Sequence, residues 1–216
     1  MGPESCVWIV SDSVMTPDYI PNFIPPRITG FEELNSTTPW LSVAETREEC
    51  FMSGWDKPPG CPFVPLSYTY GSGRGVRTYT SVPVSSAVRY CVSAVCEYLY
   101  QTEEGYADPA EHMEQNVCFL NKYRNEQDML GFHADDHPGT DHTRPICVLS
   151  FGQAREIWIR PNGTTGVVPP ENRFLLASGS LFIMPPGMQQ THQHRIPKGD
   201  RVMGPRISLT FRKFML

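Results

Sequence analysis

The sequence predicts a single domain over residues 1–216 of the α/β (α+β) class, with a C-terminal half of short β-strands packed on an N-terminal half of mixed structure. The chain has 216 residues, the size of one domain, and 40% of them are hydrophobic, enough for a packed core. Its 17 glycines and 21 prolines are too many for a helical bundle. After Asn116, short runs rich in Val, Ile, Phe and Trp alternate with turn residues, as in a β-sandwich or jelly roll.

The N-terminal part, residues 1–115, is expected to hold one strong helix and a long aromatic loop. Cys6–Val10 reads as a short strand, and residues 11–40 as a helix and a loop. Prolines and glycines in residues 54–75 exclude a long regular element, yet aromatic residues recur there. These aromatics either form a lid or binding surface or pin the loop to the core. Apolar residues at helical spacing, with serines at the start, predict a helix over Pro83–Tyr100.

The C-terminal part, residues 116–216, is expected to be the β core. Six predicted strands lie there, at 117–123, 145–151, 156–160, 173–176, 180–184 and 205–214.

Composition limits the compartment and the partners. No apolar run approaches the roughly 18 residues of a membrane span, and the start shows no secretion signal, which favours a cytoplasmic protein, or a nuclear one in a eukaryote. Seven scattered cysteines without a C-x-x-C pair indicate reduced thiols. The net charge of −5 does not indicate a nucleic-acid partner, but residues 192–216 are basic and suit either phosphates or small carboxylates.

The last predicted strand places two arginines on one face. Side chains alternate between the faces of a strand, so Ile207, Leu209 and Phe211 share one side. The other side carries Arg206, Ser208, Thr210 and Arg212. This polar side either lies in water or forms an anion pocket, since each guanidinium can hold a carboxylate through two hydrogen bonds.

The strand predicted at 117–123 alternates in the same way. Phe119, Asn121 and Tyr123 share one face. A carboxamide and a phenol side by side can donate hydrogen bonds to an anionic oxygen, or can simply form a polar strand surface.

A histidine and an aspartate two residues apart, His133 and Asp135, point the same way on an extended segment. They are two thirds of the two-histidine, one-carboxylate set that binds ferrous iron and leaves positions open. His192 and His194, which follow Asp135 in a later segment, are the candidates for the third ligand. The H-x-D spacing alone is weak, but its combination with a later histidine and two arginines on one strand face is much more specific.

The ordered set of motifs closely resembles that of the AlkB nucleic-acid dealkylases, which are Fe(II)/2-oxoglutarate dioxygenases on a double-stranded β-helix. In chain order the motifs are Asn121-x-Tyr123, His133-x-Asp135, Ser150-Phe-Gly152, Gly179-Ser-Leu-Phe-Ile-Met184, His194-Arg-Ile-Pro197 and Arg206-x-Ser-Leu-Thr-Phe-Arg212. The resemblance is clear from about residue 116 to the C-terminus and looser back to residue 47. It implies a C-terminal jelly roll that helices and a nucleotide-recognition lid from residues 1–115 cover.

The resemblance also implies roles for individual residues. Fe(II) would be bound by His133, Asp135 and His194, with His192 as a rival for the third position. The residues implied for 2-oxoglutarate, which acts with O₂, are Asn121, Tyr123, Arg206, Ser208, Thr210 and Arg212. Those implied for the substrate are Tyr68, Tyr70, Asp136 and His137, and less directly Trp55 and Arg74.

The implied activity is oxidative demethylation of N-alkylated bases, such as 1-methyladenine and 3-methylcytosine, in DNA or RNA by a monomer with no membrane partner. The products are succinate, CO₂ and an aldehyde. Many relatives have an acidic residue where this chain has His137, a side chain that can stack on a base and change charge near neutral pH. The lesion range therefore stays open.

Two alternatives remain at this stage. The negative net charge favours an AlkB-like oxygenase that acts on a protein side chain or a small molecule. A non-catalytic β-sandwich binding module is the other, although the complete set of iron ligands argues against it.

Overall fold

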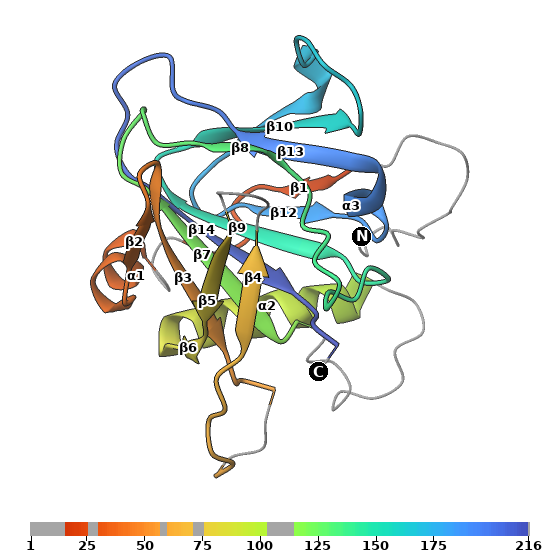
Figure 1. Cartoon of the computed structure of the whole chain (residues 1–216). Coiled ribbons are helices and arrows are strands. Elements are labelled where there is room, and N and C mark those ends of the chain that lie inside the picture. Colours follow the sequence, from red (N-terminus) through yellow and green to blue (C-terminus); the bar gives the residue numbers. More distant parts are fainter. Residues whose placement is uncertain (1–15, 26–29, 57–59, 71–75, 103–114, 216) are drawn as a thin grey trace, which may run out of the picture.

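Two β-sheets that face each other form the core of the fold (Figure 1). The computed structural model describes residues 16–25, 30–56, 60–70, 76–102 and 115–215. Within these residues the larger sheet has eight strands in the order β1-β12-β9-β14-β7-β3-β2, with β6 beside β3. They span Asp18–Ile20 (β1), Leu41–Ala44 (β2), Arg47–Ser53 (β3), Val82–Pro83 (β6), Val117–Tyr123 (β7), Ile146–Gly152 (β9), Leu181–Met184 (β12) and Arg206–Arg212 (β14).

The smaller sheet has four described strands in the order β11-β10-β13-β8. They span Leu130–His133 (β8), Arg155–Pro161 (β10), Arg173–Leu176 (β11) and His192–Ile196 (β13). A separate hairpin pairs Ser67–Tyr70 (β4) with Arg77–Thr80 (β5). The described helices are Phe31–Thr37 (α1), Ser86–Thr102 (α2) and Met188–Thr191 (α3), with a 3₁₀ turn at Pro170–Asn172 (η3). The predicted α+β class with a jelly-roll core is confirmed.

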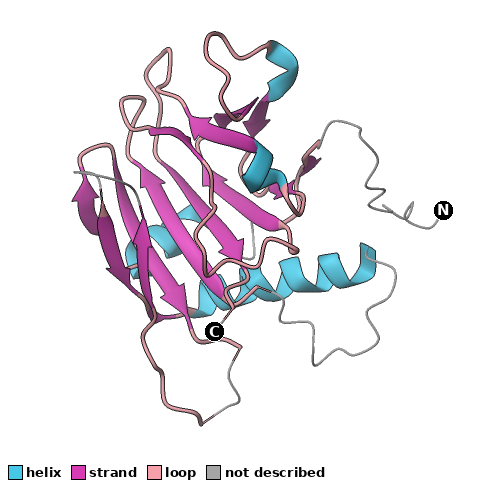
Figure 2. Cartoon of the chain, turned by 45° about the vertical axis from the view of Figure 1, so that its right-hand side comes forward, coloured by secondary structure: helices cyan, strands magenta, loops and turns pink. Residues whose placement is uncertain are grey.

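Helix α2 covers the outer face of the larger sheet (Figure 2). The Ser85 hydroxyl accepts a hydrogen bond from the Val88 N–H at 3.3 Å, so the helix begins after this cap, slightly later than predicted. Its apolar stripe shares one core cluster with residues of five strands, including the fully buried Leu209 of β14 and Leu120 of β7. The apolar residues whose helical spacing predicted this helix are the ones that this packing buries.

The polar face of β14 is buried as well, because the smaller sheet lies over it. Arg206 is 0% exposed and Arg212 only 6%. The alternative in which these side chains lie in water is therefore wrong. The same cover applies to Asn121 and Tyr123 on β7, which pairs with β14 along its whole length.

The N-terminal part contributes strands to the larger sheet in addition to the expected helices. β1 pairs with β12 and β3 pairs with β7, so both ends of the sheet come from residues before 116. The predicted strands of the C-terminal part are all present, with ends within about two residues of those read from the sequence. The strand expected at Cys6–Val10 lies outside the described residues.

The described part of the chain contains no helix that is both long and apolar enough to cross a membrane. Its six cysteines are in the thiol form and five of them are buried, as expected for reduced cysteines used as small apolar residues.

Candidate metal centre and anion pocket

Two histidines and one aspartate meet in the space between the sheets. β8 ends at His133, and the antiparallel register sets this residue directly opposite His194 on β13. Asp135 follows β8 by two residues, and one potential ligand atom of each of the three side chains lies within 4.8 Å of the others. Two imidazoles and a carboxylate at these distances form the set that can hold Fe(II) and leave coordination positions open.

The third member of this group is His194 and not His192. His194 is 7% exposed and faces Asp135, with its Nε2 atom 3.9 Å from Oδ2. His192 is half-buried at the start of β13, where its Nδ1 atom is hydrogen-bonded to the Thr191 hydroxyl at 2.8 Å. The geometry therefore favours His194 over its rival.

Neighbouring groups fix how these side chains point. His133 Nδ1 lies 2.9 Å from the carbonyl oxygen of Gly131, to which it donates, and this leaves the lone pair on Nε2. That Nε2 atom faces Asp135 Oδ1 at 3.6 Å. The backbone N–H of Asp135 donates to Gln189 Oε1 at 2.9 Å. The site is thus oriented before any ion enters it.

The protonation states of the three side chains suit a metal ion. Burial, together with the neighbouring His133, lowers the pKa of His194 to about 3, and burial lowers the pKa of His133 as well. Burial acts to raise the pKa of Asp135, but Arg212 and the two histidines outweigh it and hold that pKa below its usual value. Near neutral pH the imidazoles are neutral and the carboxylate is ionised, as metal binding requires.

Arg212 joins the metal-site carboxylate to the hairpin. Its Nη2 atom lies 2.7 Å from Asp135 Oδ1, and its Nη1 atom donates to the Tyr68 hydroxyl at 3.2 Å. The carboxylate partner of Arg212 is therefore one of the protein's own groups, and its contact with a cosubstrate stays a prediction.

Arg206 lies deeper and has fewer partners. Its Nη2 atom donates to the Ser150 hydroxyl at 2.8 Å, whereas Nε and Nη1 have no hydrogen-bond partner among the described residues. Burial lowers the pKa of Arg206 to about 10, which leaves it charged at neutral pH. A buried cation with unmade hydrogen bonds costs several kcal/mol unless an anion joins it. The donor set therefore fits one carboxylate of 2-oxoglutarate.

One pocket links Arg206 to the metal group. Its empty volume is about 580 Å³, continuous with solvent. Its polar lining comprises Arg47, Glu49, Tyr68, Asn121, Tyr123, His133, Asp135, His194, Arg206, Ser208, Thr210 and Arg212. Its apolar lining comprises Phe119, Leu130, Val148, Ile157, Leu176 and Ile196. All nine residues expected to hold metal or 2-oxoglutarate thus line one cavity.

The residues expected to bind substrate divide into several groups. Tyr68 lines the pocket, and its ring lies 4.9 Å from the imidazole of His137, which also stacks on Phe214. Asp136 is exposed and is not among the lining residues. Trp55 is not part of the pocket: it is 2% exposed in the core cluster beneath α2 and donates to the Gln115 carbonyl at 2.6 Å.

Two further candidates fall outside this description. Arg74 and the side chain of Tyr70 lie outside the described residues, although the backbone of Tyr70 ends strand β4.

His137 is a neutral ring in this setting. Its Nδ1 atom accepts a hydrogen bond from the Gly139 N–H at 3.0 Å, and burial together with Arg212 lowers the pKa of His137. The sequence suggested that His137 changes charge near neutral pH. In the structure it gains its proton at a lower pH, because protonation would remove that acceptor and add a cation beside Arg212.

Sequence reasoning missed Arg47 and Glu49. Both line the pocket from β3, and Glu49 is 0% exposed. The signal available was their R-x-E spacing, which puts both on one face of an extended segment. Nothing in the sequence indicated that this segment pairs with β7 next to Asn121.

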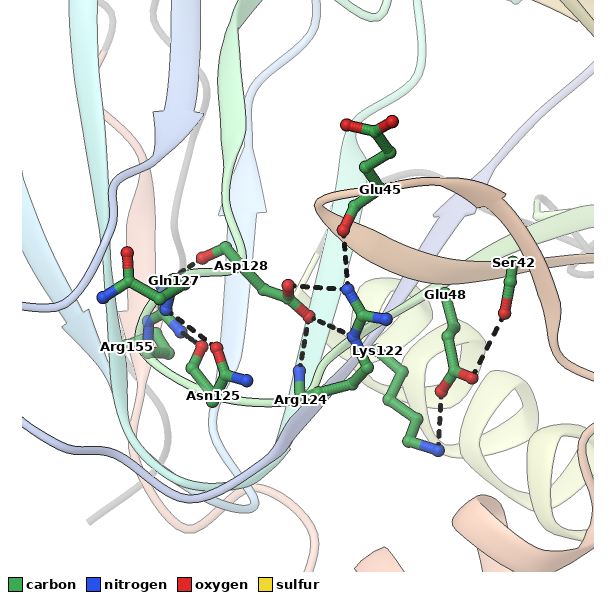
Figure 3. A network of polar contacts seen from close by, with 9 residues as sticks. All are labelled: Ser42, Glu45, Glu48, Lys122, Arg124, Asn125, Gln127, Asp128 and Arg155. Atoms are coloured by element: carbon green, nitrogen blue, oxygen red, sulfur yellow. Dashed lines mark hydrogen bonds and ion pairs between the residues drawn. The ribbon is translucent and has the colours of Figure 1, made fainter.

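A polar network holds the connection between β7 and β8, which carries the chain from the anion pocket to the metal group (Figure 3). Arg155, 1% exposed, donates to the carbonyl oxygens of Asn125 at 3.0 Å, Asp128 at 2.8 Å and Pro197 at 2.6 Å. Arg124 forms two hydrogen bonds with the Asp128 carboxylate, at 2.8 and 2.9 Å. These contacts tie the chain before β8 to the chain after β13, and so fix the strands that carry both histidines.

Comparisons with known proteins agree with this geometry. A family profile described as the 2OG-Fe(II) oxygenase superfamily matches residues 19–212. The DNA oxidative demethylase ALKBH2 of Mus musculus is 33% identical over 154 residues, which cover 69% of this chain and 58% of that protein. ALKBH2 of Bos taurus is 28% identical over 193 residues, covering 86% of this chain and 63% of that protein. The chain thus spans about three fifths of these two relatives.

A third relative and a solved structure extend the comparison. The human alpha-ketoglutarate-dependent dioxygenase alkB homolog 3 is 36% identical over 107 residues, covering 45% of this chain and 36% of that protein. A structure titled "The structure of OsALKBH1" superposes with a TM-score of 0.51 at 16% identity and covers 91% of this chain and 97% of that chain. At that identity the likeness concerns the fold alone.

Proposed function

The chain belongs to the 2OG-Fe(II) oxygenase superfamily, in its AlkB family of Fe(II)/2-oxoglutarate-dependent dioxygenases, and from this premise we propose that it oxidatively removes alkyl groups from base nitrogens in DNA or RNA. The observation that carries the proposal is the His133, Asp135 and His194 group, which lies in one pocket with the fully buried Arg206. Lesions such as 1-methyladenine and 3-methylcytosine are the expected substrates. ALKBH2, a relative at 28–33% identity, carries the name DNA oxidative demethylase.

In this proposal each group of the pocket has one task. His133, Asp135 and His194 would hold Fe(II), and Arg206 would hold one carboxylate of 2-oxoglutarate in the same pocket. When bound together, Fe(II), 2-oxoglutarate and O₂ supply the oxidation of the alkyl carbon, which leaves the base as an aldehyde while succinate and CO₂ are formed. Arg206 balances the charge of one carboxylate, and Asn121 and Tyr123 add hydrogen bonds from β7.

The remaining lining excludes water from the site. Ile157 and Leu176 from the smaller sheet and Val148 from the larger one give the pocket a buried apolar lining. Apolar surface around the site strengthens the charge interactions inside it and helps to keep solvent from the reacting centre.

We expect the alkylated base to enter beside Tyr68, whose ring and that of His137 lie on the hairpin side of the metal group. Because His137 is a neutral ring, it contributes stacking and not a negative charge for a cationic base. Asp136, exposed and next to it in the chain, offers a carboxylate for a base amino group. Recognition by stacking agrees with a substrate that has left its own base stack.

The experiment that tests the proposal measures formaldehyde released from methylated oligonucleotides by the purified protein with Fe(II) and 2-oxoglutarate. We expect release from 1-methyladenine or 3-methylcytosine in a single or a double strand, with an equal amount of succinate. Failure on both lesions in both kinds of strand would contradict the proposal. Succinate formation stimulated by a protein or small molecule, with none from the oligonucleotides, would support the alternative substrate class that the net charge of −5 favours.

The monomeric state and the cytoplasmic or nuclear location also remain predictions. Light scattering on the purified protein measures the first, and microscopy of the tagged protein in its own cell measures the second.

A further inference from the structure

The pocket contains a buried charged pair that the proposed reaction does not use. Glu49 on β3 is 0% exposed and forms an ion pair with Arg47, which is 6% exposed and lies two residues earlier on the same face. Burying two charges is costly, and apolar residues of similar volume are often at least as stable. A role in the core alone therefore explains the pair poorly, and its contacts point to the cosubstrate pocket.

Arg47 acts on Asn121, one of the residues expected to bind 2-oxoglutarate. The Nε atom of Arg47 lies 2.9 Å from the Asn121 side chain in a fully buried contact. A guanidinium can only donate hydrogen bonds, so the Asn121 atom that it meets must be Oδ1. The amide is thereby held in one orientation of the two that a free asparagine can adopt.

This orientation matters because 2-oxoglutarate is an acceptor. Its carboxylate and keto oxygens offer no N–H or O–H, so Asn121 can bind it only through Nδ2. Nδ2 has no hydrogen-bond partner among the described residues, and Asn121 lines the pocket. If the amide turned over, Oδ1 would face the anion and repel it.

Glu49 in turn connects this arrangement to the hairpin. It lies directly opposite Asn121 in the β3–β7 register. Its Oε2 atom accepts a hydrogen bond from the Tyr79 hydroxyl at 2.5 Å and lies 3.9 Å from Arg77 Nη1, both on β5. Tyr79 is opposite Tyr68 in the hairpin, and the Tyr68 hydroxyl accepts from Arg212. Two paired tyrosines thus connect the hairpin to the two sides of the pocket.

We propose that Arg47 and Glu49 are positioning residues that hold the Asn121 carboxamide with its NH₂ group toward 2-oxoglutarate and link it to the β4–β5 hairpin through Tyr79. The inference rests on the proposed function in taking 2-oxoglutarate as the ligand of this pocket. It predicts that cosubstrate affinity depends on a pair that does not itself touch the cosubstrate.

The test replaces the pair without leaving a lone buried charge. The variant R47M/E49Q keeps side-chain length and removes both charges together, so the fold is retained. The matched control is K122M/E48Q, which removes the ion pair of Glu48 and Lys122 that lies opposite in the same register on the other face of the same two strands. The readout is the dissociation constant of 2-oxoglutarate for the Mn(II)-loaded protein, measured by calorimetry without nucleic acid.

We expect R47M/E49Q to raise this dissociation constant roughly 10-fold, as for the loss of one hydrogen bond to a charged group, and the control to change it less than about twofold. Because the pair acts through Asn121, adding Asn121→Ala to R47M/E49Q should weaken binding by less than about twofold more, although Asn121→Ala alone weakens it about as much as the pair. In the native protein, 2-oxoglutarate should protect residues 77–80 from hydrogen exchange. In Tyr79→Phe this protection should be lost, because the hydrogen bond to Glu49 is removed.

Three results would overturn the inference. An unchanged dissociation constant in R47M/E49Q would do so, as would losses that multiply with Asn121→Ala, or hairpin exchange in Tyr79→Phe that responds to 2-oxoglutarate as in the native protein. In each case the proposed function would still stand if the native protein binds 2-oxoglutarate and releases formaldehyde. Absence of 2-oxoglutarate binding by the native protein would contradict both.

Discussion

The charged residues of this pocket would be solvated far better by water than by the protein, and all of them except Arg206 have a charged or metal-binding counterpart. Asp135 has Arg212 and the two histidines, and Glu49 has Arg47. Arg206 has only neutral partners among the described residues, its hydrogen bond to Ser150 and the nearby ring of Tyr123. A fully buried cation without a balancing anion is the feature that a dianion would complete.

Replacing Arg206 by methionine should weaken 2-oxoglutarate binding about 100-fold, because both the charge and the bidentate hydrogen bonds are lost from a dry site. Oligonucleotide binding should change less than about twofold. Calorimetry with Mn(II) measures the first and fluorescence anisotropy the second. Equal losses of both affinities would remove the role assigned to Arg206.

Asp135→Ala should abolish turnover and weaken metal binding at least 100-fold while the protein stays folded, since the site loses its only anionic ligand. Circular dichroism checks the fold, and Mn(II) titration followed by electron paramagnetic resonance measures the metal. Full activity in this variant would refute the ligand assignment. His192→Ala is the matched comparison and should retain metal binding, because that side chain lies outside the group.

At the scale of strands, the pairing register determines which distant residues meet in the site. The pairing of β8 with β13 sets His133 opposite His194, and the pairing of β3, β7, β14 and β9 sets Glu49, Asn121, Ser208 and Ser150 in one row across the sheet. Alternation along β7 and β14 could be read from the sequence, and so could the two faces that it creates. The row itself could not, because it depends on which distant strands pair.

The same reason explains the residues that were missed or misplaced. Arg47 and Glu49 have a strand-like spacing in the sequence, but only the pairing of β3 with β7 brings them to Asn121. Trp55 was a substrate candidate as an aromatic residue in the loop region, yet its indole packs edge-on against Phe211 at 6.4 Å in the core under α2. Local alternation was a better guide to His133 and Asp135, since the H-x-D spacing needs no knowledge of strand pairing, whereas His194 was preferred to His192 through the family resemblance.

The loop network predicts an effect on both stability and the metal site. Arg155→Leu should lower the free energy of unfolding by about 2–4 kcal/mol, because three carbonyl oxygens lose a buried donor. Metal affinity should fall as well, since the chain segments next to β8 and β13 lose their shared anchor. Urea unfolding and Mn(II) titration measure the two effects.

The control for this variant is Arg160→Leu on the outer face of the same strand. Arg160 donates a hydrogen bond to the Gln193 side chain and lies over the Phe132 ring, 3.7 Å from its centre. Among the described residues it has no hydrogen bond to a buried carbonyl oxygen. We expect a loss of about 1 kcal/mol or less there. Equal destabilisation by both changes would show that the network has no special role.

At the scale of the molecule, the distribution of charge gains a clear meaning. Residues 192–216 are basic in a chain of net charge −5. Two of these cations, Arg206 and Arg212, point into the pocket and are buried. Part of the positive charge that could suit phosphate in the sequence therefore faces the interior, where it can bind a small anion. These side chains face inward because the two sheets of the fold pack face to face, and that fold class was predicted from composition and strand spacing.

A ligand that completes the charge of the pocket should stabilise the whole fold. With Mn(II) and 2-oxoglutarate each at about 100 times its dissociation constant, we expect a gain of roughly 2.7 kcal/mol or more, hence a rise in Tm of roughly 5–10 °C for a domain of this size. Neither ligand alone should give the full rise, and a chelator should reverse it. Scanning calorimetry measures Tm. An equal rise with 2-oxoglutarate alone would contradict a site shared with the metal.

The central claim is that three side chains share one metal ion and that Arg206 receives the far carboxylate of 2-oxoglutarate. Anaerobic crystals grown with Mn(II) and 2-oxoglutarate, with data collected for the anomalous signal of manganese, test it most directly. The account predicts one anomalous peak in contact with His133, Asp135 and His194, and a 2-oxoglutarate carboxylate paired with Arg206. A peak away from these residues, or a cosubstrate that leaves Arg206 without a carboxylate, would contradict it.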